Sequence, residues 1–140
     1  MRNYTVEFPS GLYKVKSVVK EVIGFLEHNF PYASERDLCD LRLVYCELLY
    51  NAVIHGNKND SGKYVRLYVE IIENTVYSRV SDEGTGFDHI NLLKEAKHEK
   101  NLLRDHGRGI LLVYSLMDSV SFNNEGNEIK FYKQMRTSKY

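Results

Sequence analysis

The order of its periodic segments most constrains what this chain can fold into. Residues 12–29 place apolar side chains three and four positions apart, which is typical of an amphipathic helix. Residues 64–73 and 76–82 instead alternate apolar and polar side chains, which is typical of strands with one buried face. Helices and sheets with one apolar side bury those sides against each other. The sequence therefore predicts an α/β two-layer sandwich, an α+β fold, with helices on one face of a mixed, mostly antiparallel sheet.

The rest of the chain extends this pattern without repeats or low-complexity tracts. Ser34 and Asp37 have the spacing of a capping box, which indicates the start of a second helix. A polar turn at 124–127 predicts a hairpin. The other expected elements are strands at 3–8, 120–123 and 128–135 and a helix at 109–117. We expect residues 1–140 to form a single domain, which the length allows, with residues 136–140 as a frayed tail.

Charge and hydropathy exclude several classes of protein. The formal net charge is +0, so no bulk electrostatic attraction to nucleic acid or to a membrane is expected. No apolar run approaches the roughly 20 residues of a membrane span. Residues 1–10 alternate and contain Glu7, unlike a signal peptide, so a cytoplasmic location is expected. Cys39 and Cys46 lie seven residues apart in one predicted helix, about 10 Å along its axis, too far for a disulfide, and are expected to be buried thiols.

The segment from Glu47 to Asn57 carries the first chemical signal. If it is the end of a helix, then Glu47, Asn51 and His55 lie four residues apart on one polar face. An amide oxygen is a hard ligand that suits Mg²⁺, and a neighbouring carboxylate can polarise a hydroxyl group or a water. A solvated helix face is the alternative interpretation of this pattern. Under it, His55 caps or packs the helix end.

The second signal is Asp82 with Gly84 and Gly86, where an alternating strand enters a turn. Glycines there allow backbone angles that other residues avoid, and they let a ligand approach the main chain. A carboxylate at the strand end can accept a hydrogen bond from the exocyclic amine of adenine, whereas guanine offers an acceptor at that position. The alternative is an ordinary turn between two elements.

The third signal is Gly107-Arg108-Gly109, directly before an apolar helical run. Free N–H groups at a helix N-terminus bind anions, and Arg108 adds a charged donor. Nucleotide fingerprints with other glycine spacings are missing from the sequence. Residues 90–106 join the second and third signals and carry interspersed lysines and acids. This connection is interpreted as a lid over a bound nucleotide, or else as a solvated helix and loop.

In this order and spacing, the three segments resemble the N-box, G1-box and G2-box of the GHKL ATPase superfamily. The closer match is to its small single-domain branch, the bacterial anti-sigma factor serine/threonine kinases. The resemblance implies the GHKL ATP-binding fold with ATP and Mg²⁺ as cofactors. It assigns the general base to Glu47 and the metal ligand to Asn51. The cofactor-binding residues would be Asn51, Asp82, Gly84, Gly86, Gly107, Arg108 and Gly109.

The resemblance also implies a function in partner switching. Such a kinase phosphorylates an antagonist protein (an anti-anti-sigma factor), sequesters a sigma factor and forms a homodimer. Two alternatives remain open at this stage: a non-catalytic, ATP-loaded binding module, and the ATP-binding half of another signalling complex. Autophosphorylation on histidine is not expected, because His98-Glu99 lacks the proline that usually follows a phosphoacceptor histidine and no dimerisation hairpin precedes the domain. Thr85 and His106 depart from the residues that are frequent in this branch.

Overall fold

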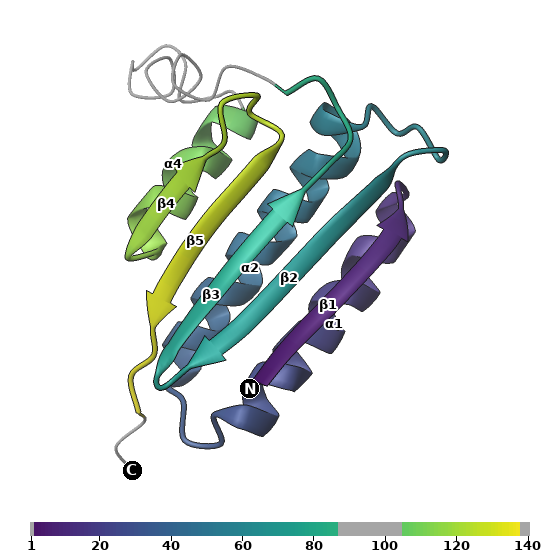
Figure 1. Ribbon diagram of the computed structural model, residues 1–140. Helices are drawn as coiled ribbons and strands as arrows, with labels where there is room; N and C mark the ends of the chain where they lie inside the picture. The colour runs from purple at the N-terminus through teal and green to yellow at the C-terminus, as the bar shows by residue number, and fades with distance from the viewer. Residues whose placement is uncertain (1, 87–104, 138–140) are drawn as a thin grey trace.

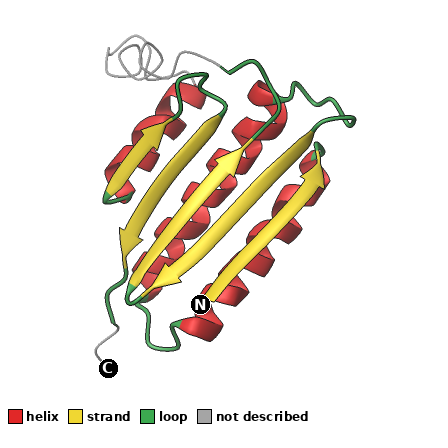
Figure 2. Ribbon diagram, in the orientation of Figure 1, coloured by secondary structure: helices red, strands yellow, loops and turns green. Residues whose placement is uncertain are grey.

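The computed structural model describes residues 2–86 and 105–137, and for residues 105–108 it describes the backbone alone. These residues form two layers, a sheet and a layer of helices that covers one of its faces (Figures 1 and 2). The elements in chain order are β1 (Arg2–Pro9), α1 (Leu12–Asn29), α2 (Glu35–Asn51), η1 (Ala52–Gly56), β2 (Tyr64–Ile72), β3 (Thr75–Ser81), α4 (Asp105–Leu116), β4 (Ser119–Phe122) and β5 (Glu128–Gln134). The predicted fold class is confirmed.

The sheet has five strands in the order β1-β2-β3-β5-β4. Each pair of neighbouring strands in the described part of the chain is antiparallel, where a mixed, mostly antiparallel sheet was expected. The register places Leu67 beside Val80 and Val80 beside Ile129, so apolar residues form rows across the inner face. This register is the one that buries the apolar alternation of every strand on the same side.

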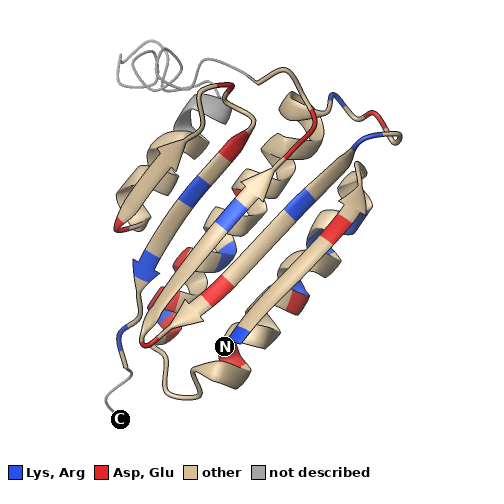
Figure 3. Cartoon of the chain, viewed as in Figure 1, with Lys and Arg blue, Asp and Glu red and all other residues tan. Residues whose placement is uncertain are grey.

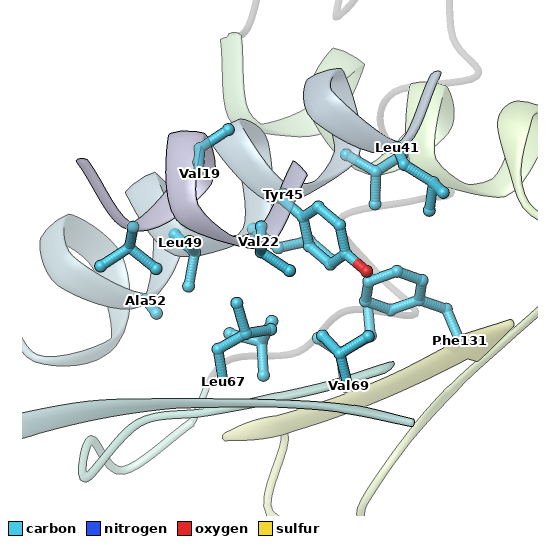
Figure 4. Packing of buried hydrophobic residues seen from close by; sticks show 14 of the residues in the cluster. Val19, Val22, Leu41, Tyr45, Leu49, Ala52, Leu67, Val69 and Phe131 are labelled. Carbon is cyan, nitrogen blue, oxygen red and sulfur yellow. The ribbon is translucent and has the colours of Figure 1, made fainter. Parts of the chain in front are cut away.

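The core lies between this inner face and the helices. The six residues of α1 with the predicted helical spacing are all buried: Val15, Val18, Val19, Val22, Ile23 and Leu26. Figure 4 shows Tyr45 of α2 reaching from the helix layer toward Phe131 of β5, and the two ring centroids are 5.7 Å apart. The Tyr45 hydroxyl is fully buried and makes a 2.7 Å hydrogen bond with Ser78 Oγ. Burial raises the pKa of Tyr45, so this hydroxyl stays protonated.

The start of α2 is tied to the C-terminal segment. Ser34 is the N-cap and accepts a hydrogen bond from the Asp37 N–H, as predicted. The Ser34 N–H, however, donates to the Arg136 carbonyl, and the buried Asp37 carboxylate accepts from the Arg136 backbone N–H (2.7 Å) and from its Nη2 (2.7 Å). The reciprocal half of the capping box is therefore absent here. Arg136 and Thr137 are held in place rather than frayed, and residues 138–140 lie outside the description.

The surface corrects one expectation from the sequence, which concerns the two cysteines. Figure 3 shows that acidic and basic residues are interspersed along the strands and helices. Among the described helices, none is long and apolar enough to cross a membrane. The expected burial of Cys39 and Cys46 was wrong, because both side chains are exposed. The face of α2 that meets the core carries Leu41, Tyr45 and Leu48, which turns both thiols outward.

Candidate functional site

The predicted site residues meet at one end of the sandwich. In Figure 1 this is the upper end, where α2 and β3 finish and α4 begins. The β4–β5 turn also reaches this end. Three segments that are far apart in the sequence thus meet there, as the motif order implied.

Glu47 and Asn51 lie in contact on the last turns of α2. The Asn51 Nδ2 donates to Glu47 Oε1 over 3.2 Å, which is the expected i, i+4 contact. The Asn51 side chain is buried, and within the described residues its Oδ1 accepts no hydrogen bond. A buried amide oxygen without a donor is a suitable position for a cation, because burial without a partner costs free energy.

His55 leaves the predicted polar stripe. The α-helix ends at Asn51, and Ala52–Gly56 form one π-helical turn, which the Asn57 N–H extends by donating to the Ala52 carbonyl over 2.8 Å. The wider π turn breaks the four-residue repeat, so His55 is exposed rather than aligned with Glu47. The prediction of a three-residue stripe therefore holds for its first two members.

Asp82 follows the last residue of β3 and bends into a tight turn. Its Oδ1 accepts a 2.8 Å hydrogen bond from the Gly84 N–H. Gly56 lies directly against this carboxylate, and Gly84 lies against the Gly56 carbonyl, so a Cβ on either glycine would overlap its neighbour. Burial raises the pKa of Asp82, while the Gly84 N–H and the charge of Lys63 act in the opposite direction. The turn thus holds a partly desolvated carboxylate close to the end of α2.

Gly86 continues the turn in the left-handed region, with φ 84°. An added Cβ would also overlap the Glu125 carbonyl of the β4–β5 turn. Both facts require glycine at this position. The β4–β5 turn is bound to the Asp82 turn a second time, because Asn127 Nδ2 donates to the Gly84 carbonyl over 3.2 Å.

The third segment lies inside α4 rather than before it. The helix was predicted to start at Gly109 but starts at Asp105, so Gly107 and Arg108 belong to its first turn. The first four N–H groups of a helix have no intrahelical acceptor, so the N–H groups open to an anion are those of residues 105–108. The Arg108 side chain lies outside the description. Most of the predicted lid, residues 90–106, also lies outside the described residues.

Gly109 is the residue at which the start of α4 contacts Glu47. The Glu47 carboxylate packs directly on the Gly109 backbone, so closely that any Cβ at position 109 would overlap it. Glu47 and Gly109 are 62 positions apart in the sequence, so the tertiary fold alone creates this contact. Glu47 therefore lies between the metal-ligand candidate Asn51 and the start of α4.

A small cavity of about 30 Å³ lies among these elements. Its lining combines the predicted site residues Asn51 and Asp82 with residues that were not predicted to belong to the site: Leu48, Ala52, Val80, Ile110, Phe122, Gly126, Asn127, Glu128 and Ile129. Apolar walls around one carboxylate and one amide suit a purine edge. The volume accommodates about one water, so the walls must separate before a base enters. Asn127 had no sequence signal, because it lies in an ordinary hairpin turn.

A larger hollow, of about 920 Å³, lies at the other end of the sheet. Several of the charged residues that line it already have partners. Lys133 Nζ donates to the Leu116 carbonyl over 3.0 Å and lies 3.7 Å from Asp37 Oδ1, and Arg136 binds Asp37. None of the predicted site residues lines it. We therefore place the candidate site at the smaller cavity, where the chemically distinctive groups converge.

The polar groups at this end of the sandwich fit ATP with Mg²⁺. Asp82 offers a partly buried acceptor for an adenine amine, and the start of α4 offers backbone N–H groups to phosphates. Asn51 offers its amide oxygen, which accepts no hydrogen bond from the part of the chain that the structure describes. Within residues 2–86 and 105–137, no cluster of three or more His, Cys, Asp or Glu side chains could hold a metal ion. A magnesium ion here would depend on Asn51 together with phosphate oxygens, as Mg²⁺ commonly does.

The chain belongs to the histidine kinase-like ATPase domain family, whose model matches residues 8–133. This confirms the predicted superfamily. Within it, the chain is 30% identical over 120 residues to an anti-sigma F factor of Clostridium perfringens (strain SM101 / Type A), covering 83% of this chain and 84% of that protein. It is 33% identical over 99 residues to the serine-protein kinase RsbW of Staphylococcus aureus (strain MSSA476), covering 66% of this chain and 62% of that protein.

Two solved structures share the fold. The RsbU and RsbW domains of a Mycobacterium tuberculosis protein match all of this chain with a TM-score of 0.67 and 14% sequence identity, and this chain spans 34% of theirs. A mycobacterial sensor histidine kinase, MprB, matches 96% of this chain and 99% of its own with a TM-score of 0.52 and 12% identity. At these identities the likeness concerns the fold alone.

Proposed function

We propose that this chain is a protein serine/threonine kinase that binds Mg-ATP and acts as an anti-sigma regulatory factor. The observation that carries the proposal is the position of Glu47, whose carboxylate contacts Gly109 at the start of α4 and Asn51 at the end of α2. A general base is useful only beside the transferred phosphoryl group. The γ-phosphoryl group of a nucleotide bound at the start of α4 would lie beside Glu47. The names of the relatives, anti-sigma F factor and serine-protein kinase, support the same activity.

Each predicted site residue has a role in this mechanism. Asp82 reads the adenine amine, and Gly84 and Gly86 shape the turn that presents it. Gly107 and Arg108 hold phosphates with the first turn of α4, and Gly109 gives the space in which Glu47 lies beside them. Asn51 holds Mg²⁺. The bound nucleotide supplies the γ-phosphoryl group, and the metal neutralises charge on the phosphates.

Glu47 completes the mechanism by accepting the proton of a serine or threonine hydroxyl. Phosphoryl transfer requires mainly positioning and charge stabilisation, so one oriented base is sufficient protein chemistry. The Asn51 amide orients the carboxylate through its 3.2 Å hydrogen bond. The contact with Gly109 keeps the carboxylate at the phosphate end of the site.

The partners in this proposal are a sigma factor and its antagonist. The chain would act in the cytoplasm as one domain and as a homodimer, with partners bound away from the nucleotide. β1 pairs with β2 alone among the described strands, so its outer edge is open to a second copy. Lys16 of α1 is exposed and available to acidic residues of a sigma factor. Light scattering that reports a monomer at high concentration, with and without ATP, would contradict the dimer.

The first test is nucleotide binding. Calorimetry should report micromolar affinity for Mg-ATP, on the order of −8 kcal/mol. Absence of ATP binding to the folded protein would refute the proposal at its first step. Capture of a small antagonist protein would then be compared between the ADP-loaded and the ATP-loaded protein. The captured antagonist is the substrate for the phosphoryl-transfer assay.

The second test separates catalysis from binding. Glu47→Gln should keep nucleotide affinity and slow phosphoryl transfer to the captured antagonist by roughly 10²-fold or more. Glu70→Gln, the same change on the opposite side of the sheet, is the matched control and should transfer at the wild-type rate. Wild-type transfer by Glu47→Gln would show that Glu47 is not the base.

One observation favours a second candidate, a non-catalytic ATP-loaded binding module. The hydrogen bond between Asn51 Nδ2 and Glu47 Oε1 gives Glu47 a structural role that requires no chemistry. Under this candidate, wild-type protein binds ATP and captures partners but transfers no phosphate to them.

A further inference from the structure

Asn57 is a buried polar residue that neither the motifs nor the proposed mechanism uses. It directly follows η1, and its relative exposure is 1%. Its Nδ2 donates to Ser10 Oγ over 2.8 Å and to the Tyr64 carbonyl over 2.9 Å. Its Oδ1 accepts from the Glu83 N–H over 2.8 Å. The side chain therefore uses both of its donors and its acceptor without contact with solvent.

These three hydrogen bonds connect parts of the chain that are otherwise separate. Ser10 lies between β1 and α1, Tyr64 begins β2, and Glu83 lies in the turn after β3. A carboxamide is planar, so its donor and acceptor directions are set together. Two partners on the donor side orient the oxygen, and the oxygen then determines where the Glu83 N–H lies.

The backbone of Asn57 provides the other half of the connection. Its N–H donates to the Ala52 carbonyl over 2.8 Å, which fastens the residue to the turn that follows Asn51. Glu83 is the direct neighbour of Asp82. One residue thus joins the segment bearing the metal-ligand candidate to the turn bearing the adenine-reading candidate.

The other hydrogen bonds of the Asp82 turn cannot replace this one. The bond from the Gly84 N–H to Asp82 is internal to the turn and moves with it. The Asp82 N–H donates to the Asn127 carbonyl over 3.0 Å, and Glu83 Oε2 accepts from the Tyr64 N–H over 3.1 Å. These two bonds tie the Asp82 turn to the β4–β5 turn and to the start of β2, rather than to the helix side. Without the Asn57 acceptor, the described contacts between this turn and the helix side are the packing of Gly56 on Asp82 and Gly84, which is not directional, so the turn can shift relative to Asn51.

We propose that Asn57 is a positioning residue that sets the place of Asp82 relative to Asn51 and thereby determines the preference for adenine over guanine nucleotides. This inference rests on the proposed nucleotide site. A carboxylate discriminates between adenine and guanine only when it is well aligned with the exocyclic group of the base, because hydrogen bonds weaken steeply when they are misaligned. A displaced Asp82 would lose more affinity for ATP than for GTP.

The test compares affinities for Mg-ATP and Mg-GTP by calorimetry in the wild type and in Asn57→Ala. The ratio of ATP affinity to GTP affinity should fall by about tenfold in the variant, since one well-aligned hydrogen bond to a charged acceptor is worth at least that factor. Tyr45→Phe is the matched control, because it also removes a buried hydrogen bond but lies in the core away from the site. It should lower stability and leave the ratio unchanged.

Amide hydrogen exchange supplies a readout that requires neither nucleotide nor variant. In the wild type without ligand, the Glu83 amide should exchange at least about tenfold more slowly than the amide of Thr85 in the same turn. In Asn57→Ala this protection should disappear. If the alanine variant does not fold, equal exchange at Glu83 and Thr85 in the wild type would still overturn the inference.

The outcomes separate this inference from the proposed function. If the wild type binds neither nucleotide, the proposed function fails, and the adenine-selectivity part of the inference fails with it. If the wild type prefers ATP and Asn57→Ala has the same ratio, the inference fails and the proposed function stands.

Discussion

Replacing Gly109 with alanine tests the contact on which the mechanism depends. Gly109 lies inside α4, where alanine is favoured over glycine by about 1 kcal/mol. The new Cβ would overlap the Glu47 carboxylate, so the Glu47 side chain must move. Leaving its rotamer costs about 0.5–1.5 kcal/mol, and loss of the Asn51 hydrogen bond costs about the same again. The two effects oppose each other, so the free energy of unfolding should change by less than about 2 kcal/mol.

A double-mutant cycle isolates the contact. In a Glu47→Ala background the overlap disappears, and Gly109→Ala should then stabilise the protein by about 1 kcal/mol. The Asn51 hydrogen bond is lost in each single variant but only once in the double variant, so it contributes to the coupling together with the rotamer cost. Urea denaturation of the four proteins should therefore give a coupling free energy of about 1–3 kcal/mol. A coupling below about 0.5 kcal/mol would show that Glu47 and Gly109 are not in contact.

The functional arm of the same experiment uses phosphoryl transfer. A catalytic group displaced by about 1 Å can lose a factor of 10² in rate. Gly109→Ala should therefore transfer at least about a hundredfold more slowly while it remains folded. Wild-type transfer by a folded Gly109→Ala protein would refute the position assigned to the base.

Three further predictions follow from the geometry. Asp82→Asn should weaken Mg-ATP binding by roughly 1–3 kcal/mol in calorimetry. It should also raise the thermal stability of the ligand-free protein at pH 7, because burial raises the pKa of Asp82 in the folded state and its ionisation therefore destabilises the fold as pH rises; a lower melting temperature would contradict this. Burial acts to raise the pKa of Asp37, but hydrogen bonds from Arg136 and the charge of Lys133 lower it overall, so the stability that Asp37 contributes is complete above a pH of about 4 and should be lost on acidification. Asp37→Asn should therefore make stability depend less on pH in the acidic range, and an unchanged acid denaturation profile would refute this role of Asp37. Gly86→Ala should destabilise the protein by about 1–3 kcal/mol in urea, because φ is 84° and the Cβ meets the Glu125 carbonyl, and a neutral effect would contradict the turn geometry.

Local periodicity predicted the parts of this protein that depend on near neighbours. The bounds of α1 match residues 12–29, because its buried stripe repeats within one helix. The contact between Glu47 and Asn51 was also predictable, since residues four apart on a helix lie next to each other on one face. The predicted bounds were wrong by one residue at the majority of strand ends, as expected where fraying and turn geometry decide them.

The sequence did not predict the details that depend on backbone irregularity. The π turn after Asn51 removed His55 from the polar stripe, and no residue pattern distinguishes a π turn from an α-helical one. The exposed positions of Cys39 and Cys46 depend on which face of α2 meets the sheet and the neighbouring helices. The early start of α4 moved the free N–H groups from Gly109 to residues 105–108.

By itself, the sequence determined the layers, the order of the motifs and the residue types that the site contains. Only the tertiary structure decided which residues from distant parts of the chain touch. The contact of Glu47 with Gly109, the tie from Asn57 to Glu83 and the anchoring of Arg136 on Asp37 each join distant parts of the chain. Such contacts arise from the register of strands and the packing of helices, and a single close approach or hydrogen bond leaves no periodic trace in the sequence.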